Sequence, residues 1–212
     1  MPFKREGYGQ VEPNQLSAQK TGQIYASLPL DKNVTVLQNG EFMFYDYASN
    51  SVIAQYEDGK TPIGEPMLVF NEIKLYEPFW QTSYKDFAMI RKGDNYVTSR
   101  LATAGYGENS DKEQAVTIEG HTEYGYRMDG IAPRLFKTNI GDIYTTNMVK
   151  AGETITYVAG EDYLAPVYNS ESKTLVLEKV ADPKTATGML WAVAKVYTMP
   201  DGQDAVKIQR VQ

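Results

Sequence analysis

The chain has no cysteine among its 212 residues and only one histidine, His121. Without cysteine it cannot form disulfides, thiolate nucleophiles, iron–sulfur clusters or cysteine-based zinc sites, and this composition fits assembly in a reducing cytoplasm. A metal site with two histidine ligands from one chain is also excluded, and any Ser-His-Asp triad would have to include His121. Because Gly120-His121-Thr122 resembles a turn, we expect a structural or surface role for this histidine.

An excess of positive charge and a long apolar run are also missing. The net charge of −6 repels phosphate backbones, and Lys and Arg are scattered along the chain, so we expect no nucleic-acid partner. No apolar run approaches the roughly 18 residues of a transmembrane helix, and a polar stretch follows Lys4 and Arg5 where a signal peptide would be apolar. We therefore expect a soluble chain with no membrane association that is not exported by that route.

What the sequence does contain is a strong hairpin pattern at residues 34–47. Two alternating apolar runs flank Asn39-Gly40, a pair favoured in two-residue hairpins because both central residues take positive φ there. Residues 149–157 match residues 37–45 at their Gly, Glu and Tyr positions, an offset of 112 residues. The match predicts a second hairpin with a strand at 154–159, and it indicates either two related β modules or a chance similarity.

Short apolar runs separated by frequent turn residues are typical of barrels and sandwiches. The clearest helix candidate is 83–92, where Ser83 and Asp86 form a capping box. A final hairpin is predicted from strands at 188–198 and 205–211. The predicted fold class is all-β with one short helix, built of antiparallel barrel- or sandwich-like modules plus an extended N-terminal arm.

The predicted organisation has three parts: an arm at 1–23, a β domain at 24–138 with a short helix near 83–92, and a second β module at 139–212. The arm has few apolar side chains and no sustained period, so we expect that it cannot bury itself. It is either a frayed terminus or an extended segment that orders against a partner. The residues that we predict to contact a partner are Tyr8, Val11, Leu16, Ile24 and Tyr25.

Other candidate sites carry weaker patterns. The sixteen tyrosines could form a sugar-stacking platform or a protein-facing patch, although tyrosines in β proteins more often line the edge of the core. The loop from Glu108 to Glu113 offers hard oxygen ligands without the spacing of an EF-hand, so we interpret it as a polar loop and leave calcium binding open. No motif marks a catalytic carboxylate pair. The acids considered for that role are Asp46, Glu72, Glu123, Asp129, Glu161 and Asp162. We therefore predict no enzymatic activity, cofactor or metal site.

Four stretches carry a resemblance to a known group of proteins. They are KREGYGQVEPNQLSAQKTGQIYASLP (4–29), VLQNGEFMFYDY (36–47), MLVFNEIKLYE (67–77) and WAVAKVYTMPDGQDAVKIQRV (191–211). Together they resemble uncharacterised virion structural proteins of tailed bacteriophages. The Gly-Glu pairs at the predicted strand starts are similar in style to capsid decoration or cement proteins, a group with no active-site residues to transfer.

This resemblance implies a structural protein of the virion, assembled in the host cytoplasm. It implies binding to the major capsid protein or other virion proteins, stabilisation of the capsid, and a homo-oligomer whose arm reaches a neighbour. We expect the arm and tyrosines to carry the contacts, because a chain of net charge −6 gains no general attraction to another acidic surface. Two alternatives stay open: another head or tail component, and a carbohydrate-binding module with a tyrosine-lined surface.

Overall fold

The computed structural model of this chain describes residues 9–25, 30–31, 34, 36–49, 51–70, 89–91, 115–118, 121–124, 133–150, 155–198 and 204–212. Strands dominate these residues, and one antiparallel sheet curls into a half-barrel, so the predicted all-β class is confirmed. In this part of the chain, no helix is long and apolar enough to cross a membrane.

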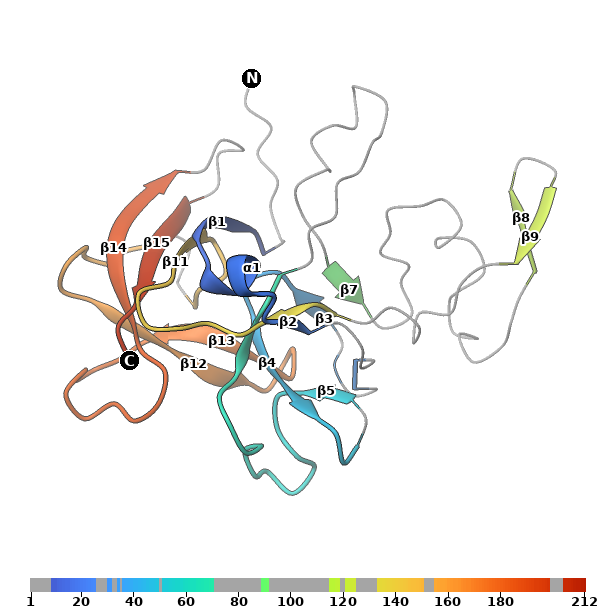
Figure 1. Cartoon of the computed structure of the whole chain (residues 1–212), viewed down its shortest axis with the longest axis horizontal. Coiled ribbons are helices and arrows are strands. Elements are labelled where there is room, and N and C mark those ends of the chain that lie inside the picture. Colours follow the sequence, from blue (N-terminus) through green and yellow to red (C-terminus); the bar gives the residue numbers. More distant parts are fainter. Residues whose placement is uncertain are drawn as a thin grey trace.

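The curled sheet has 11 strands and places its neighbours in the order β1-β11-β15-β14-β12-β13-β4-β6-β10-β2, with β5 beside β4. Figure 1 shows the curl, with β1 lying next to β11. In chain order the strands are β1 (Val11–Gln15), β2 (Ile24–Tyr25), β4 (Phe42–Asp46), β5 (Ser51–Ile53), β6 (Met67–Val69), β10 (Leu135–Phe136), β11 (Ile143–Thr146), β12 (Tyr163–Asn169), β13 (Thr174–Lys179), β14 (Trp191–Thr198) and β15 (Asp204–Arg210).

Two short ladders accompany this sheet. β3 (Val36–Gln38) pairs with β7 (Met89–Arg91), and β8 (Ala115–Ile118) pairs with β9 (His121–Tyr124). His121 therefore begins a strand and pairs with Ile118 in the ladder, not in the turn that its flanking glycine suggested.

The N-terminal segment, residues 9–25, supplies the strands at both ends of the sheet order. β1 pairs with β11 and β2 pairs with β10, and the helix α1 (Ser17–Thr21) connects them. Leu16 is 2% exposed, and Val11 and Ala18 are also buried in the core. The expectation that the arm cannot bury itself is therefore wrong for its described residues, 9–23, because strands more than a hundred residues away supply the surface that buries them.

A buried carboxylate anchors α1 to the sheet. Asp142, just before β11, accepts hydrogen bonds from the Ser17 backbone N–H and hydroxyl, both at 3.0 Å. It also accepts the Asn139 N–H at 2.9 Å, and the Asn139 side chain donates to the Ser17 hydroxyl at 2.6 Å. The first backbone N–H of a helix has no intrahelical partner, so this distant carboxylate replaces the local cap that Leu16 cannot provide.

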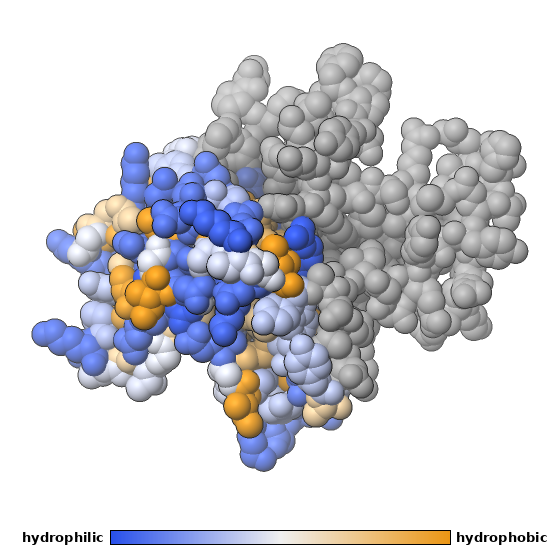
Figure 2. All heavy atoms as spheres, viewed as in Figure 1, coloured by the Kyte–Doolittle hydropathy of each residue, from blue (hydrophilic) through white to orange (hydrophobic). Residues whose placement is uncertain are grey.

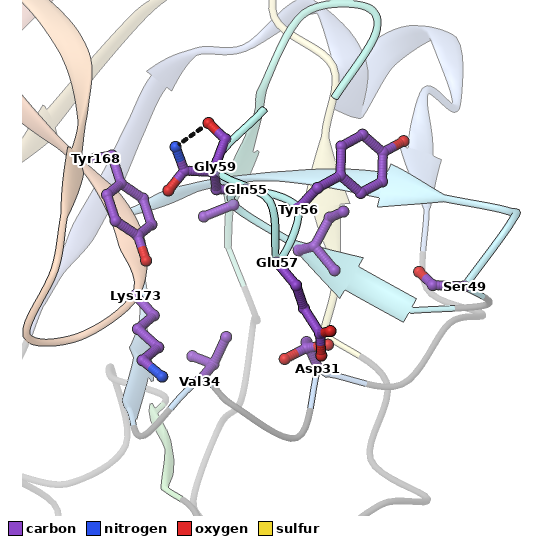
Figure 3. Close-up of a pocket in the computed structure, with 11 residues that line it drawn as sticks. Asp31, Val34, Ser49, Gln55, Tyr56, Glu57, Gly59, Tyr168 and Lys173 are labelled. Carbon is purple, nitrogen blue, oxygen red and sulfur yellow. Dashed lines mark hydrogen bonds between the residues drawn. The ribbon is translucent and has the colours of Figure 1, made fainter. Parts of the chain in front are cut away.

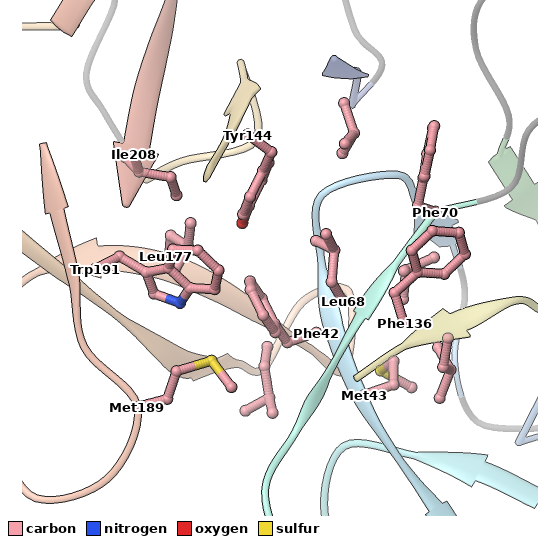
Figure 4. Packing of buried hydrophobic residues seen from close by; sticks show 14 of the residues in the cluster. Phe42, Met43, Leu68, Phe70, Phe136, Tyr144, Leu177, Met189, Trp191 and Ile208 are labelled. Carbon is pink, nitrogen blue, oxygen red and sulfur yellow. The ribbon is translucent and has the colours of Figure 1, made fainter. Parts of the chain in front are cut away.

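The core is aromatic around Trp191, which is fully buried in β14 (Figure 4). The Tyr144 ring meets it edge-on at 5.0 Å between centroids, and the Phe42 ring lies 6.0 Å away. Phe70 and Phe136 form a second edge-on pair at 5.3 Å. The Tyr144 hydroxyl and the Trp191 indole N–H have no hydrogen-bond partner among the described residues, so this core holds by packing and not by polar contacts.

The Asn39-Gly40 hairpin predicted at 34–47 is wrong, although a turn is present. Glu41 N–H donates to the Gln38 carbonyl at 3.3 Å, but only Gly40 has positive φ, at 94°, which fits a type II turn and not the type I′ turn of a tight hairpin. The flanking strands pair elsewhere, β3 with β7 and β4 with its neighbours in the curled sheet. The Asn-Gly pair therefore marks a change of direction between two sheets.

The second copy of this pattern does not form the predicted strand in its described part. Residues 155–158 form neither helix nor strand, and residues 151–154, where its turn was predicted, lie outside the described residues. The curled sheet takes strands from all three predicted parts of the chain. The boundaries at 23/24 and 138/139 stay a prediction.

The predicted helix at 83–92 is wrong at its end, because residues 89–91 form strand β7. Residues 83–88 and 92 lie outside the described part of the chain. Residues 89–91 pair with β3, a partner that the local sequence pattern could not indicate. The final hairpin is confirmed: β14 and β15 pair antiparallel from Trp191 opposite Arg210 to Thr198 opposite Asp204.

Candidate functional site

The predicted partner-contact residues fall into two environments. Val11 and Leu16 pack inside the chain's own core, so they can reach a partner only if the N-terminal segment leaves the sheet. Ile24 is half-buried against the core, whereas Tyr25 is 37% exposed. Tyr8 lies outside the described residues. Of the described residues predicted to touch a partner, Tyr25 is the one that presents its side chain to solvent.

Tyr25 belongs to a tyrosine cluster that also contains Tyr45 and Tyr47. Tyr25 meets Tyr45 edge-on with ring centroids 5.4 Å apart, and Tyr45 lies 6.4 Å from Tyr47. The Tyr45 hydroxyl donates to the Pro133 carbonyl at 3.3 Å, which fixes the central ring, while Tyr47 is 68% exposed. The cluster lies at β2, the last strand of the described sheet, and it combines aromatic area fixed at Tyr45 with the exposed side chains of Tyr25 and Tyr47.

A pocket of about 480 Å³ lies on another part of the sheet, between Asp31 and Val34, the chain following β5 and the β12–β13 turn (Figure 3). Tyr56 contributes one wall, and its hydroxyl donates to Asp46 at 3.3 Å. Tyr168 and Lys173 form the side nearest β12 and β13, and the carboxylates of Asp31 and Glu57 lie across from them. The pocket thus combines aromatic surface with groups of both charges.

Lys173 occupies an unusual backbone position in this pocket. It is the one described non-glycine residue with positive φ, at 57°, and it closes the β12–β13 turn by donating its N–H to the Asn169 carbonyl at 2.8 Å. A side chain in this region of φ costs roughly 1–2 kcal/mol, which is why glycine or asparagine usually takes it. The turn at 169–172 was predictable from Asn169-Ser170-Glu171-Ser172, but no sequence pattern indicated that the next side chain lines a pocket.

Glu41 is the most perturbed acid of the described residues. It is fully buried, and its carboxylate accepts the Gln38 N–H at 2.7 Å and the Thr174 hydroxyl at 2.8 Å. Burial raises its pKa from 4.5 to about 7, against the lowering effect of these two hydrogen bonds. Gly9 N–H donates to the Gln38 side chain at 2.6 Å, so the turn also holds the N-terminal segment. Sequence reasoning missed this burial because glutamate is usually exposed.

The other candidate acids are engaged in local structure or lie outside the description. Hydrogen bonds, chiefly from Ser49, lower the pKa of Asp46. A hydrogen bond from Lys179, at 2.7 Å, does the same for Asp162, while Glu161 is exposed. Glu72, Asp129 and the Glu108 to Glu113 loop lie outside the described residues, and Glu123 lies in β9, whose side chains are not described. Among the described side chains, no three acids or histidines gather as metal ligands would.

The described surface is mainly hydrophilic in the view of Figure 2, with separate apolar patches and no continuous apolar face. Large exposed apolar residues outside the tyrosine cluster are spread over several elements. They are Tyr56, Ile63, Ile140, Val158, Val167, Tyr168 and Val211.

Comparisons with protein-family models, with curated proteins and with solved structures give no match for this chain.

Proposed function

We propose that this chain is a non-enzymatic structural protein of a tailed-bacteriophage virion that binds and stabilises the capsid as a decoration protein. The four stretches that resemble virion proteins support this assignment, and the exposed tyrosine cluster at β2 is the structural observation that carries the binding role. Tyr25, which the sequence predicts as a partner contact, is exposed and meets Tyr45 edge-on in that cluster.

The tyrosine cluster suits a protein partner for a physical reason. Aromatic side chains held by neighbours lose little conformational entropy on binding, and tyrosine is enriched among the residues that dominate interface energies. β2 also ends the described sheet order, so a partner strand could add to it by backbone hydrogen bonds. The proposed partner is the major capsid protein, and a homo-oligomer would multiply weak contacts on a shell of repeated sites.

The test measures binding of the purified protein to capsids stripped of it. The double variant Tyr25→Ala/Tyr47→Ala should weaken binding at least about tenfold, because two exposed aromatic contacts are lost. Val158→Ala/Val167→Ala is the matched control, since it removes two exposed apolar side chains in and near β12, far from β2 in the sheet order. Equal binding by both variants would contradict the role of the cluster.

A salt series separates aromatic contacts from charge pairs. Binding should change little between low salt and about 0.5 M, where the Debye length is about 4 Å, because the cluster contains no charge. A steep loss of binding over this range would assign the interface to ion pairs.

A protein inventory of purified particles with copy numbers distinguishes a decoration protein, present in many copies, from a component of the connector or tail. Absence of the chain from the particles would overturn the virion assignment.

A further inference from the structure

The pocket beside the β12–β13 turn holds three polar side chains that the described structure does not use. The Lys173 ammonium, the Glu57 carboxylate and the Tyr168 hydroxyl all line it, and none of them makes a hydrogen bond or ion pair with another described residue. Other polar groups of the lining are already engaged: Gln55 donates to the Gly59 carbonyl, and Ser49 shares a hydrogen bond with Ser51. The unused groups leave a defined set of donors and acceptors for a ligand.

The backbone conformation of Lys173 also bears on the role of this pocket. Glycine would occupy φ of 57° without strain, yet the chain has lysine there, and its side chain enters the pocket lining (Figure 3). Strained positions of this kind persist where the surrounding structure or a function requires the side chain. The positive φ of Lys173 therefore supports a role for its side chain, beside the evidence of the pocket.

The charges of the lining narrow the class of ligand. Asp31 and Glu57 are acidic and Lys173 is basic, so the lining has a net charge of −1. An anion would face two carboxylates and a cation would face the ammonium, whereas a neutral polyhydroxylated ligand can donate to the Glu57 carboxylate and accept from the Lys173 ammonium. The rings of Tyr56 and Tyr168 add apolar surface on which the face of a sugar ring can lie.

We infer that this pocket is a saccharide-binding site, with Lys173, Glu57 and Tyr168 as its polar contacts. Its volume of about 480 Å³ is within the range of small-ligand pockets, about 300–1,000 Å³, and leaves room for a short sugar. The inference does not depend on the virion assignment. The pocket uses residues distinct from the tyrosine cluster, so either site can fail its test without the other.

The test is a calorimetric and NMR titration of the full chain with uncharged sugars at millimolar concentration. One arm uses the methyl glycosides of glucose, galactose, mannose and N-acetylglucosamine, and a second uses linear tetrasaccharides of glucose and N-acetylglucosamine. Binding in the first arm indicates a free sugar or a single terminal unit, and binding in the second alone indicates a longer glycan. Either result supports the site if the variants below lose it.

Lys173→Gly is the decisive variant, because it removes the ammonium while relieving the strained backbone. Binding should fall about tenfold or more, as expected for loss of a charged hydrogen-bond donor, in a protein that stays fully folded. Tyr168→Ala should weaken binding by a similar factor. Lys184→Gly, which removes a lysine from another exposed turn, is the matched control and should bind as the parent does.

Three results would overturn the inference. Failure of the parent protein to bind any sugar of the panel excludes a saccharide site of this class. Binding that Lys173→Gly and Tyr168→Ala leave unchanged places the sugar elsewhere on the chain. Tighter binding of glucosamine or glucose 6-phosphate than of the neutral parent sugars assigns the pocket to a charged ligand.

Discussion

The turn at 38–41 and the turn at 169–174 share a backbone feature but differ in burial. Each has one residue at positive φ: Gly40 at 94° and Lys173 at 57°. The first turn is buried and the second is exposed, and the two are joined where the Thr174 hydroxyl donates to Glu41. Positive φ alone therefore does not select glycine in this chain.

Crowding explains the difference between the two turns. A Cβ added to Gly40 would lie 2.6 Å from the Thr146 hydroxyl oxygen and 2.7 Å from the Met148 Cβ, closer than real Cβ contacts. At the second turn the Lys173 side chain is exposed and lines a pocket. At the buried turn, both the positive φ and the close neighbouring atoms favour glycine. At the exposed turn, only the positive φ favours it.

The largest effect should come from Gly40→Ala. It adds a strained φ, about 1–2 kcal/mol, to overpacking against β11 and the residues after it, about 1–3 kcal/mol, so we expect a loss of about 3–4 kcal/mol in the free energy of unfolding. Urea denaturation of the full chain measures this loss. Gly160→Ala is the matched control, because Gly160 has φ of 81° but no atom within 4 Å of an added Cβ. Equal losses in both variants would show that φ, and not crowding, governs the buried turn.

The second effect concerns the pH dependence that Glu41 brings to the buried turn. Its folded pKa of about 7 lies above its usual value of 4.5, so between these pH values the unfolded chain releases a proton that the folded chain keeps. Stability contributed by the protonated form is therefore complete below pH 4.5 and is lost as pH rises to about 7. One pKa unit corresponds to about 1.4 kcal/mol, so the loss is about 3 kcal/mol.

Glu41→Gln tests this dependence because an amide imitates the protonated carboxyl group. Its oxygen can accept the Gln38 N–H while its NH₂ group donates to the Thr174 hydroxyl oxygen. The Thr174 hydroxyl can then donate its hydrogen bond to the Ser172 hydroxyl. The variant should be more stable than the parent protein above pH 7 and should lack the decline between pH 4.5 and 7. Parallel stability–pH curves for the two proteins would rule out Glu41 as the titrating group.

The smallest effect is expected at the exposed turn. Lys173→Gly should raise the free energy of unfolding by about 1 kcal/mol, because glycine adopts φ of 57° without the Cβ clash, offset in part by its greater freedom in the unfolded chain. Lys173→Ala is the control, since it removes the charge and keeps the strain. Chemical denaturation should place the alanine variant near the parent protein, and a gain as large as that of glycine would attribute the effect to charge.

Both turns were predicted from the sequence, but strand pairing was predicted only in part. Asn39-Gly40 and Asn169-Ser170-Glu171-Ser172 both predicted a turn, and both turns are present. Pairing was predicted correctly where sequence-adjacent strands pair, as in β14 with β15, and wrongly for β3 and β4, whose partners lie elsewhere. Turn chemistry is local, whereas pairing depends on which edges the rest of the fold leaves open.

For the candidate sites too, the sequence predicted single residues but not the contacts that depend on the fold. Tyr25 was predicted as a contact from its place in the N-terminal segment, but its edge-on contact with Tyr45 depends on β2 lying near β4 in the curled sheet. The pocket brings Asp31 and Glu57 close to Tyr168 and Lys173, and no spacing along the chain predicts this proximity. Leu16 was placed on a partner surface because its burial depends on distant strands of its own chain.

The position of the N-terminal segment at both ends of the sheet has a consequence for folding kinetics. The pairs Val11–Thr146 and Ile24–Phe136 each close a loop of more than half the chain, and such distant contacts form slowly because the entropy of the loop is lost before they stabilise the fold. Docking of this segment is therefore expected among the late steps of folding. Until then the outer edges of β11 and β10 are open to a segment from another copy, so the yield of correctly folded monomer should fall as the chain concentration during refolding rises.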